Sequence, residues 1–198
     1  MTMPIDTHLI TRRSIAEQIE ELGQFRIAIF RDWPYLYDGN MPYERDYLSR
    51  YARCESSFVL VGRDAHGIRY ACTAIPLKHE LPQFQQSFLE RQIPVDNKFY
   101  LGEIMVRREL RGQGMGRLLM NKALSTIAEL NHPSAEVVLA TVIRPSTHPL
   151  KPADYNASDH LWTKSGFARR DDLVMTLDWK DIDQERETTK EMVYWLRK

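Results

Sequence analysis

The segment that most constrains the fold is a glycine cluster at residues 111–116, with the sequence Arg-Gly-Gln-Gly-Met-Gly. Before it, residues 99–106 form an apolar run typical of a β-strand, and after it the apolar residues of 115–130 recur at helical spacing. Glycine has no Cβ, so backbone N–H groups in such a loop can converge on an anion at the positive end of the helix. The segment predicts a unit with both sheet and helix, whose loop either binds a phosphate group or is only a tight turn.

Hydrophobic periodicity predicts helices and strands along the rest of the chain. We expect a first helix from Ser14, interrupted at Gly23 and ended by Pro34, and a charged, solvated turn at 180–190. No repeat, linker or break in composition divides residues 1–198, so one α/β domain is expected. Further helices are expected at 42–53, 81–92 and 156–164, and strands at 57–61, 68–75, 99–106, 137–143, 173–179 and 192–196.

Charge and cysteine content argue against several classes of protein. The 198 residues contain 27 Lys and Arg and 27 Asp and Glu, whereas binders of nucleic acids or acidic membranes usually carry a basic excess. The two cysteines, Cys54 and Cys72, fit a reducing compartment better than a disulfide scaffold. No stretch approaches the roughly 18 apolar residues of a membrane span, and the first ten residues lack the pattern of a secretion signal. We therefore expect a cytoplasmic protein with no nucleic-acid or membrane partner.

Other motifs for phosphate groups or metals fit poorly. The P-loop spacing from Gly62 to Gly67 continues without the required lysine. A dinucleotide fingerprint needs GxGxxG and an acidic residue after the next strand; this chain has GxGxG and Arg144, which leaves an NADP site as an alternative. His79 begins a segment like the zinc motif HExxH, but the second histidine is missing and Pro82 interrupts it. We expect no metal site.

Two segments resemble the GNAT superfamily of acetyl-CoA-dependent N-acetyltransferases. The pattern Arg-x-x-Gly-x-Gly at Arg111, Gly114 and Gly116 is similar to its coenzyme A signature. Residues 161–167, Leu-Trp-Thr-Lys-Ser-Gly-Phe, are similar to its late helix-to-strand segment. The resemblance implies a single-domain α/β (α+β) fold whose mixed, mostly antiparallel sheet is splayed between two central strands and flanked by helices on both faces.

The resemblance also implies where acetyl-CoA, as co-substrate, would lie. In GNAT proteins the splayed strands enclose the pantetheine arm, and the loop amides hold the pyrophosphate. The acetyl group passes directly to a primary amine, which needs a base because its pKa of about 10.4 keeps it protonated near neutral pH. The residues carried over are the backbone of Met105 and Val106 for the arm, Arg111 for positive charge, and Gly112, Gln113, Gly114, Met115, Gly116 and Arg117 for the pyrophosphate.

Glu103 is the candidate for that base. It is the one carboxylate in the apolar strand 99–106, where a charge is costly unless it is paired or hydrated. Many GNAT proteins carry a glutamate in this strand. The alternative is a structural ion pair with an arginine such as Arg144 or Arg169, because such pairs also retain buried charges. Both interpretations stay open.

Tyr155 is the candidate for the acid that protonates the departing thiolate. GNAT proteins commonly carry a tyrosine where this chain has Trp162, whose indole N–H cannot serve as an acid. They carry an asparagine at the position of Tyr155, so this helix departs from the family pattern twice. The alternatives are that Tyr155 only packs against its neighbours and that solvent is the acid.

The aromatic segment 33–37 lies between the first two expected helices, the region that flanks the substrate in GNAT proteins. Aromatic faces attract a cationic amine. A simpler interpretation is that the rings cover the core, and that a histidine in the proline-rich loop 144–155 faces solvent or caps a turn. The aromatic segment 33–37 and the loop 144–155 both resemble those of a bacterial branch of the superfamily. The candidate acceptor-site residues are Trp33, Tyr35, Tyr37 and His148.

The leading hypothesis is an N-acetyltransferase that moves an acetyl group from acetyl-CoA to a primary amine of a small molecule or peptide, as a monomer or homodimer. The alternative is a catalytically silent acyl-CoA-binding sensor, which Trp162 in place of the usual tyrosine keeps open. A third hypothesis is a nucleotide-dependent oxidoreductase.

Overall fold

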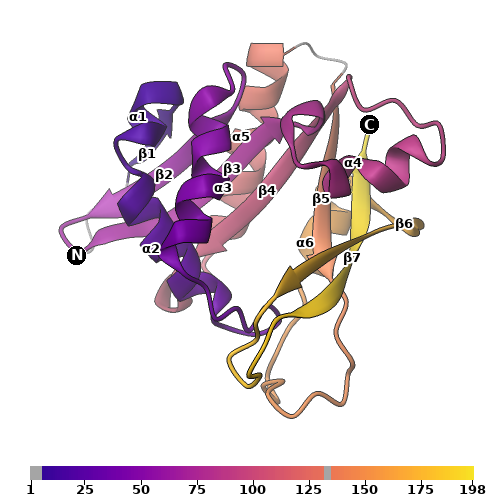
Figure 1. Ribbon diagram of the computed structural model, residues 1–198. Helices are drawn as coiled ribbons and strands as arrows, with labels where there is room; N and C mark the ends of the chain where they lie inside the picture. Colours follow the sequence, from indigo (N-terminus) through magenta and orange to yellow (C-terminus); the bar gives the residue numbers. More distant parts are fainter. Residues whose placement is uncertain (1–5, 132–134) are drawn as a thin grey trace.

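A seven-stranded sheet forms the centre of the structure, a computed structural model that describes residues 6–131 and 135–198 (Figure 1). Its strand order is β1-β2-β3-β4-β5-β7-β6, and neighbouring strands are antiparallel except β4 and β5, which are parallel. The expected mixed, mostly antiparallel sheet is confirmed. The strands are β1 (Thr7–Ile10), β2 (Phe58–Asp64), β3 (Gly67–Pro76), β4 (Lys98–Val106), β5 (Glu136–Val142), β6 (Ala168–Trp179) and β7 (Thr188–Arg197).

The two central strands, β4 and β5, separate along their length. They pair only between residues 98–100 and 136–138. Beyond this point β4 continues to Val106 along β3, while β5 continues to Val142 along β7. The expected splay is therefore confirmed, and from residue 101 to its end the edge of β4 that faces β5 has no strand partner within residues 6–131 and 135–198.

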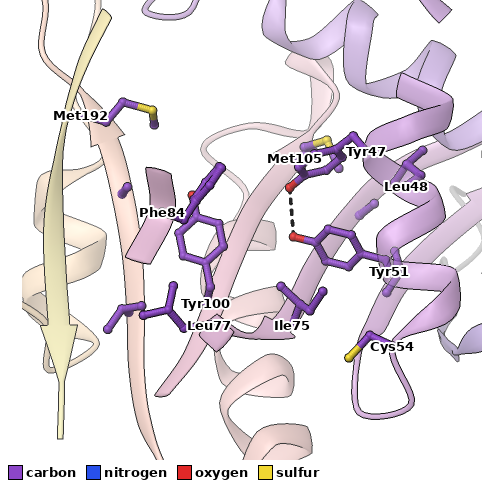
Figure 2. Packing of buried hydrophobic residues seen from close by; sticks show 14 of the residues in the cluster. Tyr47, Leu48, Tyr51, Cys54, Ile75, Leu77, Phe84, Tyr100, Met105 and Met192 are labelled. Atoms are coloured by element: carbon purple, nitrogen blue, oxygen red, sulfur yellow. Dashed lines mark hydrogen bonds between the residues drawn. The ribbon is translucent and has the colours of Figure 1, made fainter. Parts of the chain in front are cut away.

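Helices cover both faces of the sheet, as expected. Neighbouring residues of β3 belong to different cores, since Ala71 joins one buried cluster and Cys72 the other, and successive side chains of a strand point to opposite faces. The first cluster lies under α1 to α4 (Figure 2), and the second lies under α5 and contacts Trp162 of α6. The helices are α1 (Arg12–Ala16), α2 (Ile19–Phe30), α3 (Met41–Arg53), α4 (Pro82–Leu89), α5 (Met115–Asn131) and α6 (Asp159–Lys164).

The first helical segment is broken at a different place from the one predicted. The expected interruption at Gly23 is wrong: Gln18 leaves the helical conformation and divides α1 from α2. Gly23 lies inside α2, where a Cβ would come within 2.8 Å of the Met41 side chain. This glycine therefore allows α2 to pack closely on α3 rather than ending a helix.

Two features at the sheet's ends were not predicted. Strand β1 is a short edge strand paired with β2, too short to carry a clear alternating pattern. The charged stretch 180–190 is not a fully solvated turn, because Asp181 and Lys190 are buried, 3.3 Å apart, and Asp181 also pairs with Arg144. Burial of these charges is possible because each has an opposite partner.

Two further expectations concern membranes and metals. No helix in the described ranges is both long and apolar enough to cross a bilayer. Within residues 6–131 and 135–198, no three His, Cys, Asp or Glu side chains gather in a group that could hold a metal ion.

Candidate active site

The glycine loop joins the end of β4 to the start of α5. A short 3-10 turn at Arg108–Leu110 is followed by Gly112 and Gly114, with φ of +74° and +83°. Other residues rarely adopt these angles, whereas a Cβ at either position would meet no atom within 4 Å. The requirement for glycine is therefore conformational, and the space next to both residues is open.

The amide groups at the start of α5 are available to a ligand. A helix leaves its first N–H groups without partners inside the helix, and the first recorded backbone bond here is from Leu118 N–H to Gly114 O at 3.0 Å. Residues 111–114 are exposed. The positive end of the helix dipole of α5 and its free N–H groups together favour an anion at this position. The loop therefore has the geometry of a phosphate site.

The two segments that resemble the GNAT superfamily meet in space. A Cβ at Gly116 would lie 3.2 Å from the Leu161 side chain of α6, so α5 and α6 approach closely at this point. Trp162, on the same helix, packs against the core under α5. Its indole nitrogen is buried and has no hydrogen-bond partner among the described residues.

Arg111 does not stand at the loop as an unpaired cation. Its Nη2 lies 2.9 Å from Asp32, and its Nε donates to the carbonyl of Val106 at 3.0 Å. The expected positive charge is thus compensated by a carboxylate. Arg111 instead ties the loop to the residue before Trp33, which links the glycine loop to the aromatic segment.

Glu103 is almost fully buried, with 8% of its side chain exposed, and it forms an ion pair with Arg26. The expected partners Arg144 and Arg169 are wrong, because they pair with Asp181 and Asp171. A network surrounds the carboxylate: Tyr47 donates to it at 2.6 Å, Thr73 donates to its other oxygen, and Arg26 also pairs with Glu44 at 2.5 Å.

The charge state of this network follows from its pairing. Burial alone would lower the pKa of Arg26, but the charges of Glu103 and Glu44 raise it well above its ordinary value, so the guanidinium stays protonated. Burial and the charge of Glu103 raise the pKa of Tyr47 well above 10. Its hydroxyl therefore stays a donor to Glu103.

A β-bulge in β4 makes room for the network. Thr73 pairs with Glu103 and Ala74 with Leu101, which leaves Gly102 as the extra residue. A Cβ on Gly102 would lie 2.6 Å from both the Thr73 and the Tyr51 hydroxyl oxygens. Glycine at this position therefore lets the polar side chains reach the strand.

The sequence contained a signal for part of this network. Arg26 occupies a position of the apolar stripe of its helix, the pattern of a buried charge that needs a partner. Tyr47 and Tyr51 stand four residues apart and so share one face of α3. Nothing in the sequence indicates that Glu44 is buried, because it lies in the first turn of α3, where acidic residues are common on the surface.

Three of the candidate site residues come together from distant parts of the chain. The Trp33 ring lies 5.0 Å from the His148 ring and 6.0 Å from the Tyr155 ring, centroid to centroid. Burial and Asp159 raise the pKa of Tyr155, whereas Arg111 lowers it, which puts this ring within electrostatic range of the loop arginine. The aromatic group of Trp33, His148 and Tyr155 therefore lies near the glycine loop.

Tyr35 and Tyr37 pack separately from that group. Tyr35 contacts Phe30 and Trp179, and its raised pKa results from burial, then Glu103 and Tyr155. Tyr35 is therefore within electrostatic range of both Glu103 and Tyr155. Tyr37 packs on Tyr43 instead.

A buried arginine holds the aromatic segment in place. Arg144, at the end of β5, donates to the backbone carbonyls of Pro34 and Tyr35 at 2.8 and 2.6 Å. The same guanidinium makes two bonds to Asp181, at 2.6 and 2.9 Å. Arg144 is thus occupied by protein groups, which argues against its predicted alternative role at an NADP ribose phosphate.

Solved structures of acetyltransferases share this fold. A ribosomal-protein-alanine N-acetyltransferase from Brucella melitensis aligns over 98% of this chain and 99% of its own, with 12% identity and a TM-score of 0.59. An acyl-CoA N-acyltransferase from Pseudomonas aeruginosa aligns over 98% and 100%, with 16% identity and a TM-score of 0.59. An acetyltransferase of the GNAT family from Staphylococcus aureus aligns over 97% and 98%, with 14% identity and a TM-score of 0.58.

The chain therefore has the GNAT fold, and the resemblance found in its sequence is confirmed at the level of the fold. No protein-family model and no curated protein sequence matches the chain.

Proposed function

We propose that the protein is an acetyl-CoA-dependent N-acetyltransferase that acts on a primary amine of a small molecule or peptide. The observation that carries this proposal is the exposed glycine loop at the start of α5, next to the gap between β4 and β5. The loop offers N–H groups to an anion, and the free edge of β4 offers backbone groups to an extended, amide-containing arm. The fold shared with acetyltransferases supports the same function.

Acetyl-CoA, when bound, supplies the acetyl group as a thioester. On this proposal the backbone of Met105 and Val106 binds the pantetheine arm, and the loop of residues 112–117 binds the pyrophosphate. Arg111 acts by positioning the loop through Val106 and Asp32 rather than as a free cation.

Glu103 takes the proton of the acceptor amine, directly or through one water. A carboxylate accepts about four hydrogen bonds. Those from Arg26, Tyr47 and Thr73 occupy three of these positions, which leaves one for the amine or the water. The arginine charge offsets the cost of burying the carboxylate in its ionised form, which is the form that can take a proton.

Tyr155 donates a hydrogen bond to the departing thiolate. Since burial and Asp159 raise its pKa above the usual value of 10, whereas an ordinary thiol has a pKa of about 8.5, full proton transfer from the phenol would be unfavourable. The thiolate therefore takes its proton from solvent. The matching acceptor site consists of Trp33, His148 and Tyr155, and its ring faces attract an ammonium group. Tyr35 and Tyr37 pack outside this group.

We further propose that residues 1–198 act as one domain, as a monomer or homodimer in the cytoplasm, without a nucleic-acid or membrane partner or a metal. The balanced charge and the two buried free thiols, Cys54 and Cys72, support a reducing compartment and a small-molecule or peptide acceptor.

The test is release of the coenzyme A thiol when the protein is mixed with acetyl-CoA and a panel of primary amines, with mass spectrometry of the product. We expect thiol release that depends on the amine, and a product heavier by one acetyl group. Glu103→Gln removes the proposed base and should lower the rate of thiol release. Thiol release at the same rate without any amine would contradict the proposal.

The second candidate function is a silent acyl-CoA sensor, which Trp162 favours because it carries no acidic hydroxyl. Saturable binding of acetyl-CoA with no turnover across the panel would support the sensor. Saturable binding of NADPH without binding of acetyl-CoA would instead support an oxidoreductase.

A further inference from the structure

Two buried tyrosines link Glu103 to a second buried glutamate, Glu80. The Tyr47 hydroxyl oxygen lies 2.6 Å from Glu103 Oε1, and the Tyr51 hydroxyl oxygen lies 3.0 Å from Glu80 Oε1. The two tyrosine oxygens lie 2.9 Å apart, and Figure 2 shows their hydroxyls pointing toward one another. The four side chains form one continuous series of close oxygen contacts from β4 to the turn before α4.

The number of hydrogens in this series is one too few if both glutamates are ionised. Three oxygen–oxygen contacts need three hydrogens, one for each hydrogen bond. The two tyrosines supply only two, and both are used on the carboxylates. The contact between the tyrosine oxygens would then lack a hydrogen, which is costly for buried oxygens 2.9 Å apart.

The third hydrogen belongs on Glu80 rather than on Glu103. Glu103 has an arginine and a threonine as further donors, which suit an ionised carboxylate. Apart from Tyr51, the described residues offer Glu80 only the N–H of Leu81 as a donor, at 3.2 Å. Glu80 is 4% exposed, and the nearest nitrogen of Arg50 is 3.6 Å away, beyond hydrogen-bond distance. With a proton on Glu80, its carboxyl O–H would donate to the Tyr51 oxygen, and the Tyr51 hydroxyl would donate to the Tyr47 oxygen. The Tyr47 hydroxyl would then donate to Glu103, so that each contact holds one hydrogen.

We propose that Tyr47 and Tyr51 form a proton path between Glu103 and Glu80, and that Glu80 carries a proton in the resting protein. The function of the path rests on the proposed role of Glu103 as the base, whereas the resting proton on Glu80 does not.

The path moves a proton along the series with a half-turn of one carboxyl group and rotation of two hydroxyls. The acceptor ammonium gives its proton to Glu103 and keeps the electron pair on nitrogen. Glu80, whose side chain is 0% exposed, gives its proton to a water that enters beside Arg50, whose side chain is 20% exposed. The free position that takes the amine proton is on Glu103 Oε2, because Arg26 and Tyr47 both bond to Oε1. A half-turn of the carboxyl group brings this proton to face Tyr47, and the two tyrosine hydroxyls rotate toward Glu80. The proton on Glu103 then passes to Tyr47, the Tyr47 proton to Tyr51, and the Tyr51 proton to Glu80. Glu103 is again ionised and Glu80 again protonated.

The surrounding charges agree with a neutral Glu80. Burial raises its pKa, against the opposing effects of Arg50, the Tyr51 hydroxyl and the Leu81 N–H. From β4 it faces the charge of Glu103 and the phenol of Tyr100, and from β7 the phenol of Tyr194. With Glu80 neutral, the charges of Arg26 and Arg50 balance those of Glu44 and Glu103, so the buried network has no net charge.

Carboxyl ¹³C NMR of the full chain, labelled at glutamate, tests the resting proton without any substrate. The signal that disappears in Glu80→Gln should keep the chemical shift of an acid at pH 7, while the signal that disappears in Glu103→Gln should show a carboxylate. A carboxylate shift for Glu80 at pH 7 would overturn the proposal.

The stability of Glu80→Gln provides a second readout. Glutamine mimics the neutral acid, because its amide can donate to Tyr51, so we expect the urea midpoint of wild type at pH 7. If Glu80 were ionised and paired with Arg50, the substitution would remove the negative charge from that pair. The variant would then be less stable than wild type or would fail to fold.

Kinetics with an accepted amine test the path itself. Tyr51→Phe, which leaves the contacts of Glu103 intact, should lower kcat several-fold at unchanged KM and increase the solvent deuterium isotope effect. Combining it with Glu80→Gln should cause no further loss, because both variants interrupt one path. Tyr70→Phe, which removes a buried hydroxyl bonded to Thr7 on another part of the sheet, should change neither quantity.

Wild-type kcat and isotope effect in Tyr51→Phe would overturn the path. If no amine is turned over at all, the proposed function fails, and the NMR spectra at pH 7 still decide where the resting proton lies.

Discussion

Replacing Arg26 by methionine tests the buried network most sharply, because this one guanidinium holds two carboxylates. Arg26 pairs with Glu44 and Glu103, and the three side chains are 7%, 0% and 8% exposed. Methionine preserves much of the apolar stem but removes the charge and the donors. Both carboxylates would then remain in the core without their cation.

The expected loss of stability is large. Removing one partner of a buried ion pair costs about 3–5 kcal/mol, and two carboxylates depend on this arginine, so we expect the upper part of that range. For a domain of this size each kcal/mol lowers Tm by about 2–4 °C, so a loss of about 4–5 kcal/mol gives a decrease of roughly 8–20 °C. Urea unfolding followed by circular dichroism would measure the free energy of unfolding at pH 7.

The pH dependence identifies the cause. Without the arginine, the buried carboxylates of the folded variant bind protons more readily than those of the unfolded chain, so its stability should rise as the pH falls from 7 toward 5. The matched control is Arg45→Met, which breaks an exposed pair with Glu20 and should leave the urea midpoint nearly unchanged. Equal midpoints for the two variants, or a deficit that grows as the pH falls, would refute the reasoning.

Three further predictions concern the site. Glu103→Gln should lower turnover more at pH 7 than at pH 9, where about 100-fold more of an alkyl amine is neutral, and an equal loss at both pH values in the rate profile would count against a base. Gly102→Ala should cost about 1–3 kcal/mol in thermal unfolding because its methyl group would meet the Tyr51 hydroxyl at 2.6 Å; an unchanged Tm would show that the bulge has room. Arg144→Met should raise the KM of the amine and leave acetyl-CoA binding unchanged, since it frees the carbonyls of Pro34 and Tyr35; the opposite pattern in steady-state kinetics would contradict this.

Local patterns made the glycine loop and most elements predictable. The positive φ at Gly112 and Gly114 and the start of α5 at Met115 follow from residues within one short segment. The strands around the loop also have apolar patterns that do not depend on distant partners. The same reasoning misplaced the break in the first helix, because glycine is required at position 23 for close packing against Met41 and not for backbone flexibility.

Partners distant in the chain could not be predicted. Glu103 was expected to be either a base or half of an ion pair, and the sequence could not choose Arg26 over the other arginines, because 77 residues separate the two. Likewise, Asp181 looked solvated because its neighbours are charged, while its burial depends on Arg144 and Lys190. Which charges are paired is decided by the topology of the sheet, not by local composition.

The proposed function requires the glycine loop at the start of α5 to bind acetyl-CoA, which calorimetric titration of acetyl-CoA measures. We expect saturable binding to wild type, at least a tenfold loss of affinity in Gly114→Glu, and wild-type affinity in Gly67→Glu, which adds the same side chain at another glycine of positive φ in the β2–β3 turn. The absence of binding to wild type, or equal affinity in Gly114→Glu, would contradict the account.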